Sequence, residues 1–594
     1  MRIKIIAILF FTTTFCFSQS PELAYNYFRK GEYEKATVLY QQLYEKNKVR
    51  RDYFKKLLSC YQLTENFEEA TNLLQQHIKT FPNQVNLNIE IGYNFQLQDQ
   101  QETATPYYEK ALHLIDENPN YGYLIGRTFQ DNHLLDYALK AYKRAMELNP
   151  ELNYDAYVAL IYGEKAELEK MFDSYLNMVS KNENYFSTVQ RYAGRFITDD
   201  SLDSNNIIFR KLLLKRLQAN PNNAWNMLLS WLYMQQKDYD KALIQEKALY
   251  NRNHESLDRI VELGSVAFND TDYETTKNTF QFVLENTSNP GLEVEAQLYL
   301  LQTGVATAIS NKEIETVNEK FKLLLTNYGV NSNTIDLQIA YADFLTFKKD
   351  EPQEAILILE EALKRTTSQF QNGSVKVKLA DILVYTNKFN QALINYTQVQ
   401  TSLKNSILAQ TARFKVAQTS YFKGDYKWAL TQLKVLKSST SQLIANDALE
   451  LHLLISDNIA DDSIPKALQL YAKADVLAFQ NKNKEAIDSL SAVLATYKGH
   501  PIEDEALFKQ AALYEKTKKY NFAEENYQKI IALEATGILV DNAYYKLGML
   551  YEQQLDDVEK AKEMYQKIIF EFPSSIYLVD ARKRFRKLRG DTIN

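Results

Sequence analysis

The chain has 594 residues, of which 45% are hydrophobic, and its 41 Tyr and 30 Phe make it too apolar for a disordered protein. Its net charge of -6 excludes a general electrostatic attraction for nucleic acid. Only 16 Gly and 11 Pro disfavour an all-β fold, which needs frequent turn residues, and favour long helices with short connections.

Residues 1–18 have the pattern of a signal peptide. Cationic residues precede an apolar stretch at 5–17 that is too short to span a bilayer, and residues 16–18 form a small-x-small cleavage site. We therefore expect export of the mature chain. The alternative is a lipoprotein signal with Cys16 as the lipidated residue, but Phe15 occupies the place where that signal normally has a small residue.

Cleavage leaves Cys60 as the one remaining cysteine, so the mature chain has no internal disulfide to form. Cys60 adjoins Leu57, Leu58 and Tyr61 on an apolar helix face. We expect it to be a buried small hydrophobic residue rather than a reactive thiol.

Small residues recur at a constant interval in the first part of the chain. They stand thirty-four positions apart, and four positions after each comes an aromatic residue or Leu. The small residues are Ala36, Ala70, Ala104 and Ala138, and the residues that follow are Tyr40, Leu74, Tyr108 and Tyr142. Twelve positions before each small residue lie Ala24, Leu58, Gly92 and Gly126. Small side chains let two antiparallel helices approach closely, and the rings fill the space between successive pairs.

The pattern weakens and then resumes. Residues 151–220 are expected to hold two degenerate repeats, with Phe172 and Tyr175 in the core of a second helix. Ala242 and Thr276 then restore the original interval.

In the second half the interval lengthens to thirty-seven or thirty-eight positions. The small residues there are Ala355, Ala392, Ala429, Ala486, Ala523 and Ala561. The longer gap between Ala429 and Ala486 leaves room for an extra helix at 443–457. A polar run at 286–290 that ends in Pro is the favoured break between the halves, and 331–333 is the second candidate.

This repeat resembles the tetratricopeptide repeat family. The family has a small residue and an aromatic residue on a first helix, Ala and an aromatic residue on a second helix, and a closing Pro, here Pro82 and Pro150. The resemblance covers nearly all of the mature chain. It implies an all-α fold, a right-handed superhelical α-solenoid of antiparallel helix pairs. The expected parts are a signal peptide at 1–18, an N-terminal array at 19–285, degenerate at 151–220, and a C-terminal array at 291–594.

The end of the chain resembles the repeats of periplasmic proteins in outer-membrane assembly and cell-envelope systems. The matching residues are Tyr565, Phe572, Pro573, Ser574, Ser575 and Ala581. In those repeats a second helix ends in Phe-Pro, and the next helix starts from a Ser cap. We therefore expect Ser574 or Ser575 to cap a last helix at 574–589. The resemblance implies a place in the periplasm of a Gram-negative bacterium, soluble or peripherally attached to the outer membrane.

No catalytic, cofactor or metal site is expected. The six His are scattered, without a His-x3-His pair or a Cys partner for zinc. No phosphate loop or nucleophile motif occurs in a suitable strand–turn–helix context.

In tetratricopeptide proteins the ligand usually lies along the concave face, which the first helix of each repeat lines. The corresponding positions carry aromatic, amide and cationic groups, which suit an extended peptide or a partner's helix. They are Tyr25, Phe28, Arg29, Lys55, Ser59, Gln62, Tyr93, Gln96, Tyr123, Arg127 and Gln130, with Trp231 in a later repeat. The alternative is that several of them are ordinary solenoid surface. Tyr25 and Tyr93 occupy places where a carboxylate clamp needs Asn, so that function is not supported.

The last predicted helix has a basic face. Its cations are Arg582, Lys583, Arg584, Arg586, Lys587 and Arg589, and its apolar residues recur at helical spacing. The favoured interpretation is a capping helix whose cations suit a helix C-terminus. The alternative is attachment to an anionic membrane surface, a glycan or an acidic partner.

Taken with the resemblance, these features predict a non-catalytic scaffold or adaptor that binds other proteins, in particular envelope or outer-membrane proteins. No cofactor and no nucleic-acid partner are expected. A peptide- or glycan-binding receptor is the alternative function, and a hydrolase or regulator with a polar cluster at 151–220 is a third.

Overall fold

The computed structural model describes residues 21–82, 84–254, 256–436, 442–459, 465–533 and 537–590. Within these ranges the regular elements are 32 α-helices and three short 3-10 helices, with no strand. The all-α prediction is therefore confirmed. The expected signal peptide and Cys16 lie outside the described residues.

The chain divides into two compact units, Met1–Leu228 and Leu229–Asn594. The first unit contains α1 (Pro21–Arg29), α2 (Tyr33–Lys46), α3 (Arg51–Leu63), α4 (Phe67–Thr80), α5 (Leu87–Gln96), α6 (Gln101–Glu117), η1 (Pro119–Tyr121), α7 (Gly122–Asp131), α8 (Leu135–Leu148), α9 (Asp155–Glu164), α10 (Leu168–Lys181), η2 (Glu183–Tyr185), α11 (Phe186–Ala193) and α12 (Ser204–Ala219). Helix α13 (Asn223–Gln235) contains the division.

The second unit continues with α14 (Tyr239–Asn253), α15 (Asp258–Asn269), α16 (Tyr273–Asn286), α17 (Pro290–Thr307), α18 (Asn311–Tyr328), η3 (Ser332–Thr334), α19 (Ile335–Phe347), α20 (Pro352–Leu363), α21 (Gln369–Tyr385), α22 (Phe389–Ser402), α23 (Ile407–Lys423), α24 (Tyr426–Leu436), α25 (Gln442–Asp457), α26 (Lys466–Phe479), α27 (Asn483–Thr496), α28 (Ile502–Lys516), α29 (Tyr520–Leu533), α30 (Val540–Gln553), α31 (Val558–Glu571) and α32 (Leu578–Arg589). The polar run at 286–290 lies inside this unit, where it connects α16 to α17, two helices that pack on each other.

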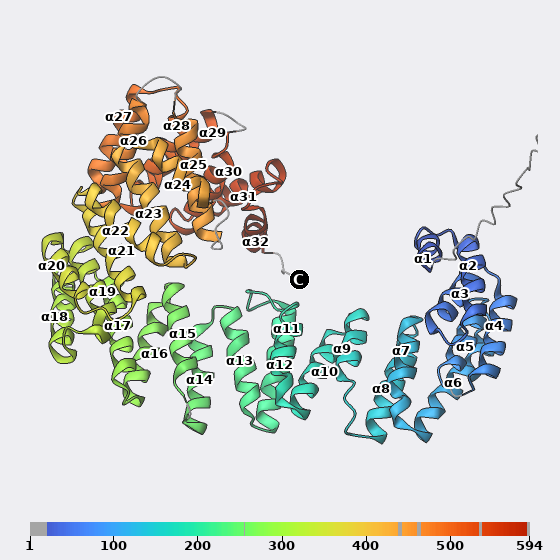
Figure 1. The fold of residues 1–594 in the computed structure, drawn as a ribbon. Helices are drawn as coiled ribbons and strands as arrows, with labels where there is room; N and C mark the ends of the chain where they lie inside the picture. Colours follow the sequence, from blue (N-terminus) through green and yellow to red (C-terminus); the bar gives the residue numbers. More distant parts are fainter. Residues whose placement is uncertain are drawn as a thin grey trace, which may run out of the picture. The chain divides into compact units, whose positions relative to one another are not determined.

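Most consecutive helices pack as pairs joined by short turns, which Figure 1 shows within each unit. We call the first helix of a pair A and the second B. In chain order, the described helices give twelve such pairs before α25 and three after it, followed by α32. Helix α25 confirms the extra helix expected at 443–457. Successive A helices also touch, as α5 and α7 or α19 and α21 do, so each pair stacks on the next.

The turn from helix A to helix B repeats the same backbone geometry. One residue has a positive φ, and the next N–H bonds back to a carbonyl of helix A, as Leu134 does to Phe129 at 2.8 Å. The positive-φ residues in the first four pairs are Gly31, Glu65, Asp99 and His133. Later in the chain they are Asp350, Asn387 and Gly424, and then Asn481, Lys518 and Asp556. The turns therefore keep the shorter interval of the sequence pattern in the first group and its longer interval in the later groups.

In several pairs a small residue of helix A packs against a ring of helix B. A Cβ placed on Gly92 would lie 2.5 Å from the ring of Tyr108, and one on Gly126 would lie 2.5 Å from the ring of Tyr142. Both rings are fully buried. The Tyr108 hydroxyl donates to Gln96 Oε1 at 2.9 Å, so its polar end is satisfied by the end of helix A. The anchor alanines of the sequence pattern are also fully buried, as expected.

Two details of the last repeat differ from expectation. Helix α32 begins at Leu578, and its N-cap residue is Tyr577, whose side chain makes no capping hydrogen bond to the helix. Ser575 Oγ instead accepts from the N–H of Tyr577 at 3.1 Å, in the turn before the helix. The prediction of a Ser cap directly on the last helix is therefore wrong, because one further turn separates the serines from it.

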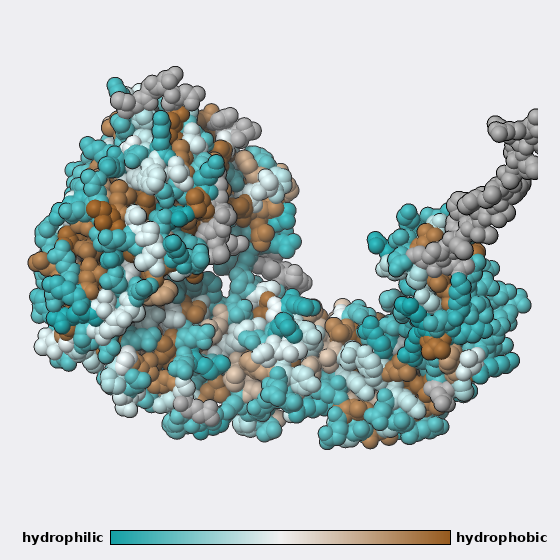
Figure 2. All heavy atoms as spheres, in the orientation of Figure 1, coloured by the Kyte–Doolittle hydropathy of each residue, from teal (hydrophilic) through white to brown (hydrophobic). Residues whose placement is uncertain are grey.

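Among the described residues, no helix combines the length and the hydropathy that crossing a bilayer requires. On the face drawn in Figure 2, apolar residues occur in small groups between polar ones.

Candidate interaction surface

The A helices of the first unit present side chains on a common surface. Lys55 Nζ of α3 lies 3.8 Å from Asp131 Oδ2 of α7, although α5 stands between these helices in the stack. Arg127 Nε of α7 lies 3.0 Å from Asp131 Oδ1. Two of the predicted groove residues, Lys55 and Arg127, therefore share one carboxylate. We call the surface formed by α3, α5, α7, α9 and α11 the A-helix surface.

Glu90 of α5 completes this charged group. Its carboxylate accepts from Asn132 Nδ2 at 3.4 Å, and its side chain is buried. Burial raises the pKa of Glu90 above its usual value, against the opposing effects of Lys55 and the Asn132 hydrogen bond. The start of the A-helix surface is thus a cluster whose charges are largely matched within the protein.

Three tyrosines continue the A-helix surface across α7, α9 and α11, and we call them the tyrosine ladder: Tyr123, Tyr157 and Tyr192. The rings of Tyr123 and Tyr157 are 5.4 Å apart in an edge-to-face arrangement. The pKa of Tyr157 is raised above its usual value, first by the neighbouring Tyr123 hydroxyl, then by burial, and also by Tyr192. Tyr123 keeps 44% of its surface exposed. Tyr157 and Tyr192 are half-buried, so a partner can reach the exposed Tyr123 ring and the other two rings in part.

Cationic groups stand at the α11 end of the ladder. The guanidinium groups of Arg191 and Arg195 lie 5.5 and 5.6 Å from the centre of the Tyr192 ring. Both arginines are exposed. A guanidinium held over a ring keeps its planar N–H donors available for a carboxylate.

Sequence reasoning missed Tyr157, Tyr192, Arg191 and Arg195. The available signal was the interval itself, because Tyr157 stands thirty-four positions after Tyr123, and Tyr192 stands thirty-five positions after Tyr157. Between 151 and 220 the pattern of small residues is hard to recognise, so the sequence pattern does not reveal the repeats in that stretch. The structure places α9 to α12 there, with α9, α11 and α12 all packed on α10, and Phe172 and Tyr175 are buried as expected.

The other predicted groove residues occupy several environments. Tyr25 and Arg29 are exposed on α1, whereas Phe28 packs against the rings of Tyr33 and Tyr40 and lies under the Lys56 ammonium. Phe28 therefore contributes mainly to packing.

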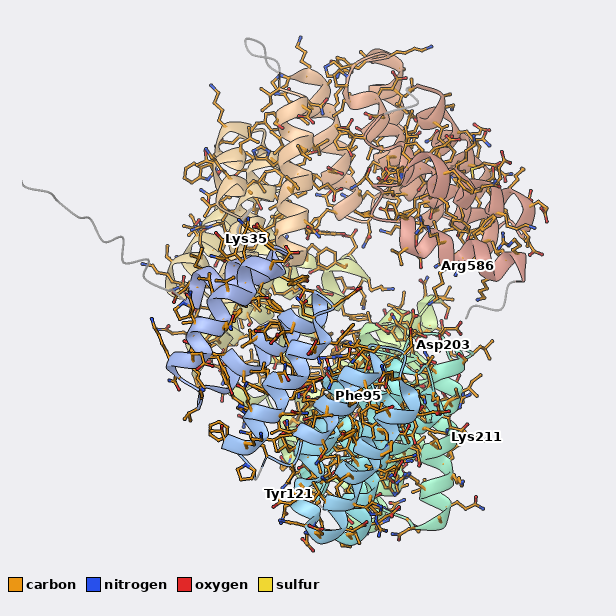
Figure 3. All side chains as sticks on the ribbon, turned by 90° about the vertical axis from the view of Figure 1, so that its right-hand side faces the viewer. Lys35, Phe95, Tyr121, Asp203, Lys211 and Arg586 are labelled. Carbon is orange, nitrogen blue, oxygen red and sulfur yellow. The ribbon has the colours of Figure 1, made fainter. Side chains whose placement is uncertain are left out.

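The amides lie at the ends of the A helices. Gln96 is used by Tyr108, and Gln62 Nε2 and Gln130 Oε1 are buried without a hydrogen-bond partner among the described residues. Tyr93 and Trp231 are half-buried on α5 and α13, and Ser59 Oγ donates to the Lys55 carbonyl at 2.9 Å. Figure 3 shows the side chains of the first unit, including Phe95 on α5 and Lys211 on α12.

In the second unit, the A helices α19, α21 and α23 carry charges that are paired with one another. Lys378 contacts Asp343 and also lies 3.9 Å from Asp381. Lys415 Nζ lies 3.2 Å from Asp381, which also accepts from the Tyr396 hydroxyl at 2.6 Å. These pairs link α19, α21 and α23. The surface is satisfied internally and offers a partner less than the tyrosine ladder does.

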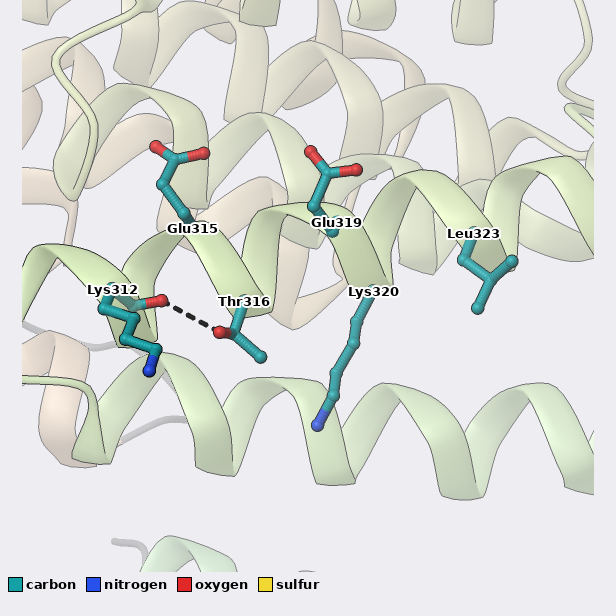
Figure 4. Close-up of a pocket in the computed structure, with 6 residues that line it drawn as sticks. All are labelled: Lys312, Glu315, Thr316, Glu319, Lys320 and Leu323. Carbon is teal, nitrogen blue, oxygen red and sulfur yellow. Dashed lines mark hydrogen bonds between the residues drawn. The ribbon is translucent and has the colours of Figure 1, made fainter.

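A shallow groove of about 480 Å³ runs along α18 and is lined by Lys312, Glu315, Thr316, Glu319, Lys320 and Leu323. Figure 4 shows the two ammonium groups pointing to one side of the helix and the two carboxylates to the other. Thr316 Oγ1 donates to the Lys312 carbonyl within the helix. The polar groups do not converge on one point, so we assign no function to this groove.

The remaining observations concern Cys60 and groups that could bind a metal ion. Cys60 is fully buried, and burial raises the pKa of its thiol to about 11, which confirms an inert cysteine. The described residues contain no group of three or more His, Cys, Asp or Glu side chains that could hold a metal ion.

Comparison with known proteins gives one family match. Residues 542–575, which include α31 and most of α30, match the family model of the tetratricopeptide repeat. No curated protein sequence matches the chain. Chains in many solved structures are similar to this one, among them chains in the following three. In the structure of Naa15/Naa10 bound to HypK-THB, the identity is 12%, the alignment covers 96% of each chain and the TM-score is 0.30. In the crystal structure of the APC/C hetero-tetramer Cut9-Hcn1, these values are 14%, 95% of each chain and 0.24. In the crystal structure of yeast Tom70, they are 13%, 95% of this chain and 98% of that chain, and 0.27.

Proposed function

Since the chain is a tetratricopeptide-repeat solenoid, a fold that mediates protein–protein interactions, we propose that it is a non-catalytic scaffold that binds an extended segment of a partner protein along the A-helix surface of its first unit. The observation that carries this proposal is the tyrosine ladder, in which the rings of Tyr123 and Tyr157 lie 5.4 Å apart on two successive A helices and two exposed guanidinium groups stand over Tyr192 on the next. Planar rings give a partner contact area at low entropic cost.

The ladder and its cations together suggest the chemistry of the segment. Apolar or aromatic side chains pack on the rings of Tyr123 and Tyr157, and carboxylates bind Arg191 and Arg195 at the α11 end. Charge-assisted bonds from guanidinium to carboxylate are stronger than neutral ones and fix the orientation of the segment. The cluster of Lys55, Glu90 and Asp131 lies at the other end of the surface, and its charges are already matched. It therefore disfavours a partner segment that carries a second block of like charges at that end.

The place of action is also a proposal. Residues 1–18 and the Phe-Pro repeat end at 572–573 favour an exported protein that works in the periplasm, in outer-membrane or envelope assembly. Release of the protein by osmotic shock from cells of a Gram-negative host tests export. Recovery from the cytoplasm with residues 1–18 still attached would contradict it.

The binding proposal is tested by affinity purification of the tagged full chain from its own cells, followed by mass spectrometry. We compare the wild type with Tyr123→Ala and with Arg191→Ala/Arg195→Ala. The matched controls are Tyr185→Ala, an exposed ring on η2, and Lys110→Ala/Lys140→Ala on the B helices α6 and α8. We expect the surface variants to lose one specific set of proteins and the controls to keep it.

A peptide display library gives the direct measurement. Truncation of a central ring in an interface typically costs about 1–2 kcal/mol, so selected peptides should bind Tyr123→Ala about tenfold more weakly. Selected peptides should be enriched in carboxylates. A library that returns only basic peptides, or peptides that bind all variants equally, contradicts the proposal. If the library yields no binder and a glycan array does, the glycan-receptor alternative is favoured.

A further inference from the structure

Helix α32 has an outward face that carries cations and no exposed carboxylate. Ala581 is buried, and Phe585 and Leu588 pack against the last repeat. The opposite side of the helix bears Arg582, Arg586 and Lys587, all exposed. Figure 3 labels Arg586 on this helix.

The single carboxylate of the helix is used on the inward side. Arg584 Nε bonds to Asp580 Oδ2 at 2.6 Å, and its other nitrogen bonds to Glu552 Oε2 at 2.9 Å. Tyr545 also donates to Asp580, at 2.8 Å. In contrast, Arg582, Arg586 and Lys587 form no ion pair with any described residue. Arg584 therefore fixes the helix in place, while the outward cations remain unmatched.

Two large aliphatic side chains stand beside these cations. Ile576 is 84% exposed in the turn before the helix, and Val579 is 78% exposed in its first turn. Val579, Arg582 and Arg586 follow one another at spacings of three and four residues, which places them on one stripe of the helix. The outward face thus combines protruding apolar groups with unmatched positive charge.

We propose that this face of α32 docks the protein on a membrane surface that contains anionic lipids. The cations are attracted to the layer of anionic headgroups. The neighbouring aliphatic side chains enter the boundary between headgroups and acyl chains. An acidic protein would use the cations and would have no need for Ile576 and Val579. The chain as a whole has a net charge of -6, so the attraction is local to this helix. The inference does not depend on the partner segment of the A-helix surface.

The test is sedimentation of the full chain with vesicles of phosphatidylcholine alone or mixed with phosphatidylglycerol. We expect binding to the mixed vesicles and weakening in high salt. Arg582→Ala/Arg586→Ala/Lys587→Ala should lower the partition coefficient for the mixed vesicles about 100-fold, because the variant loses three cations that are attracted to the anionic lipid headgroups. The matched control removes three exposed lysines of the same unit, as Lys312→Ala/Lys320→Ala/Lys427→Ala, and should retain binding.

A second variant separates a membrane from other anionic partners. Ile576→Ser/Val579→Ser keeps every cation, and we expect it to lower vesicle binding while leaving binding to soluble heparin unchanged. Circular dichroism of all variants checks that the repeats remain folded. Equal binding to both kinds of vesicle, or equal loss in the lysine control, would overturn the proposal. So would an aliphatic variant that binds vesicles as the wild type does, because the face would then recognise charge alone.

Discussion

At the scale of single residues, the contact between a glycine of helix A and a ring of helix B is the tightest repeated feature. Gly92, Gly126, Gly264 and Gly548 each lie against a ring, and an added Cβ would approach that ring within 2.8 Å or less. The helix could accept alanine at these positions on propensity alone. The ring leaves no room for it, so packing and not backbone freedom selects glycine here.

Gly126→Ala should therefore destabilise the first unit. The new Cβ would meet the fully buried ring of Tyr142 at 2.5 Å, and overpacking of this kind costs about 1–3 kcal/mol, more than the gain in helix propensity. Thermal unfolding followed by circular dichroism measures the effect. Gly163→Ala is the control, since its Cβ meets only the flexible Met171 thioether at 3.2 Å. A Gly126→Ala protein as stable as the control would show that the ring can move.

Glu505 on α28 makes stability depend on pH. Burial, followed by the effects of Asp504, raises the pKa of Glu505 to about 9, and its Oε2 is buried with no hydrogen-bond partner among the described residues. An unfolded Glu ionises near pH 4.5. Between pH 4.5 and 9 the unfolded state therefore loses this proton while the folded state keeps it, and the contribution to stability falls as pH rises.

Glu505→Gln removes that loss because the amide stays neutral. We expect the variant to gain about 1 kcal/mol or more over the wild type at pH 8 and to differ little from it at pH 4.5. Urea unfolding at the two pH values gives the comparison. Glu525→Gln, an exposed carboxylate on the neighbouring helix α29, is the control and should show no such difference. A gain that is the same at both pH values would mean that the carboxyl is ionised in the folded protein.

At the scale of the helix pair, the turn residue in the left-handed region sets how helix B folds back on helix A. Most of these residues are not glycine, and Ala166 has a φ of 56°. A left-handed conformation costs an alanine about 1 kcal/mol. The turn is retained because the following N–H of Glu167 bonds to the Tyr162 carbonyl at 2.9 Å.

Ala166→Gly should relieve this cost and stabilise the first unit by about 1 kcal/mol. The matched control is Ala156→Gly, within helix α9, where the same change should destabilise by about 1 kcal/mol. Both are measured by chemical unfolding of the purified chain. The explanation fails if the two substitutions shift stability in the same direction.

The repeats were predictable at this scale because their signal is local. The alanine anchors and the rings four positions later report which side of each helix is buried, and helix α25 followed from the length of one gap. What sequence could not supply was the pairing of polar groups. Neither the bond from Arg584 to Glu552 nor the contact of Lys55 with Asp131 follows from repeat position, because each joins different helices. The tyrosine ladder was missed because its anchors are weak.

At the scale of the whole molecule, each helix pair contacts mainly its neighbours, so stability should be distributed along the chain. A local substitution then weakens nearby repeats and leaves distant ones unchanged. Gly126→Ala and Gly548→Ala form a matched pair for this question, because each places a Cβ against a buried tyrosine ring, one in each unit.

Hydrogen exchange followed by mass spectrometry resolves the outcome. Gly126→Ala should speed exchange in α5 to α9 and leave α28 to α31 as in the wild type, whereas Gly548→Ala should do the reverse. The extent of the faster exchange on either side of each substitution measures how many repeats unfold together. If either variant speeds exchange evenly through both units, the chain unfolds as one cooperative body, and the energy of each repeat cannot be treated as a local quantity.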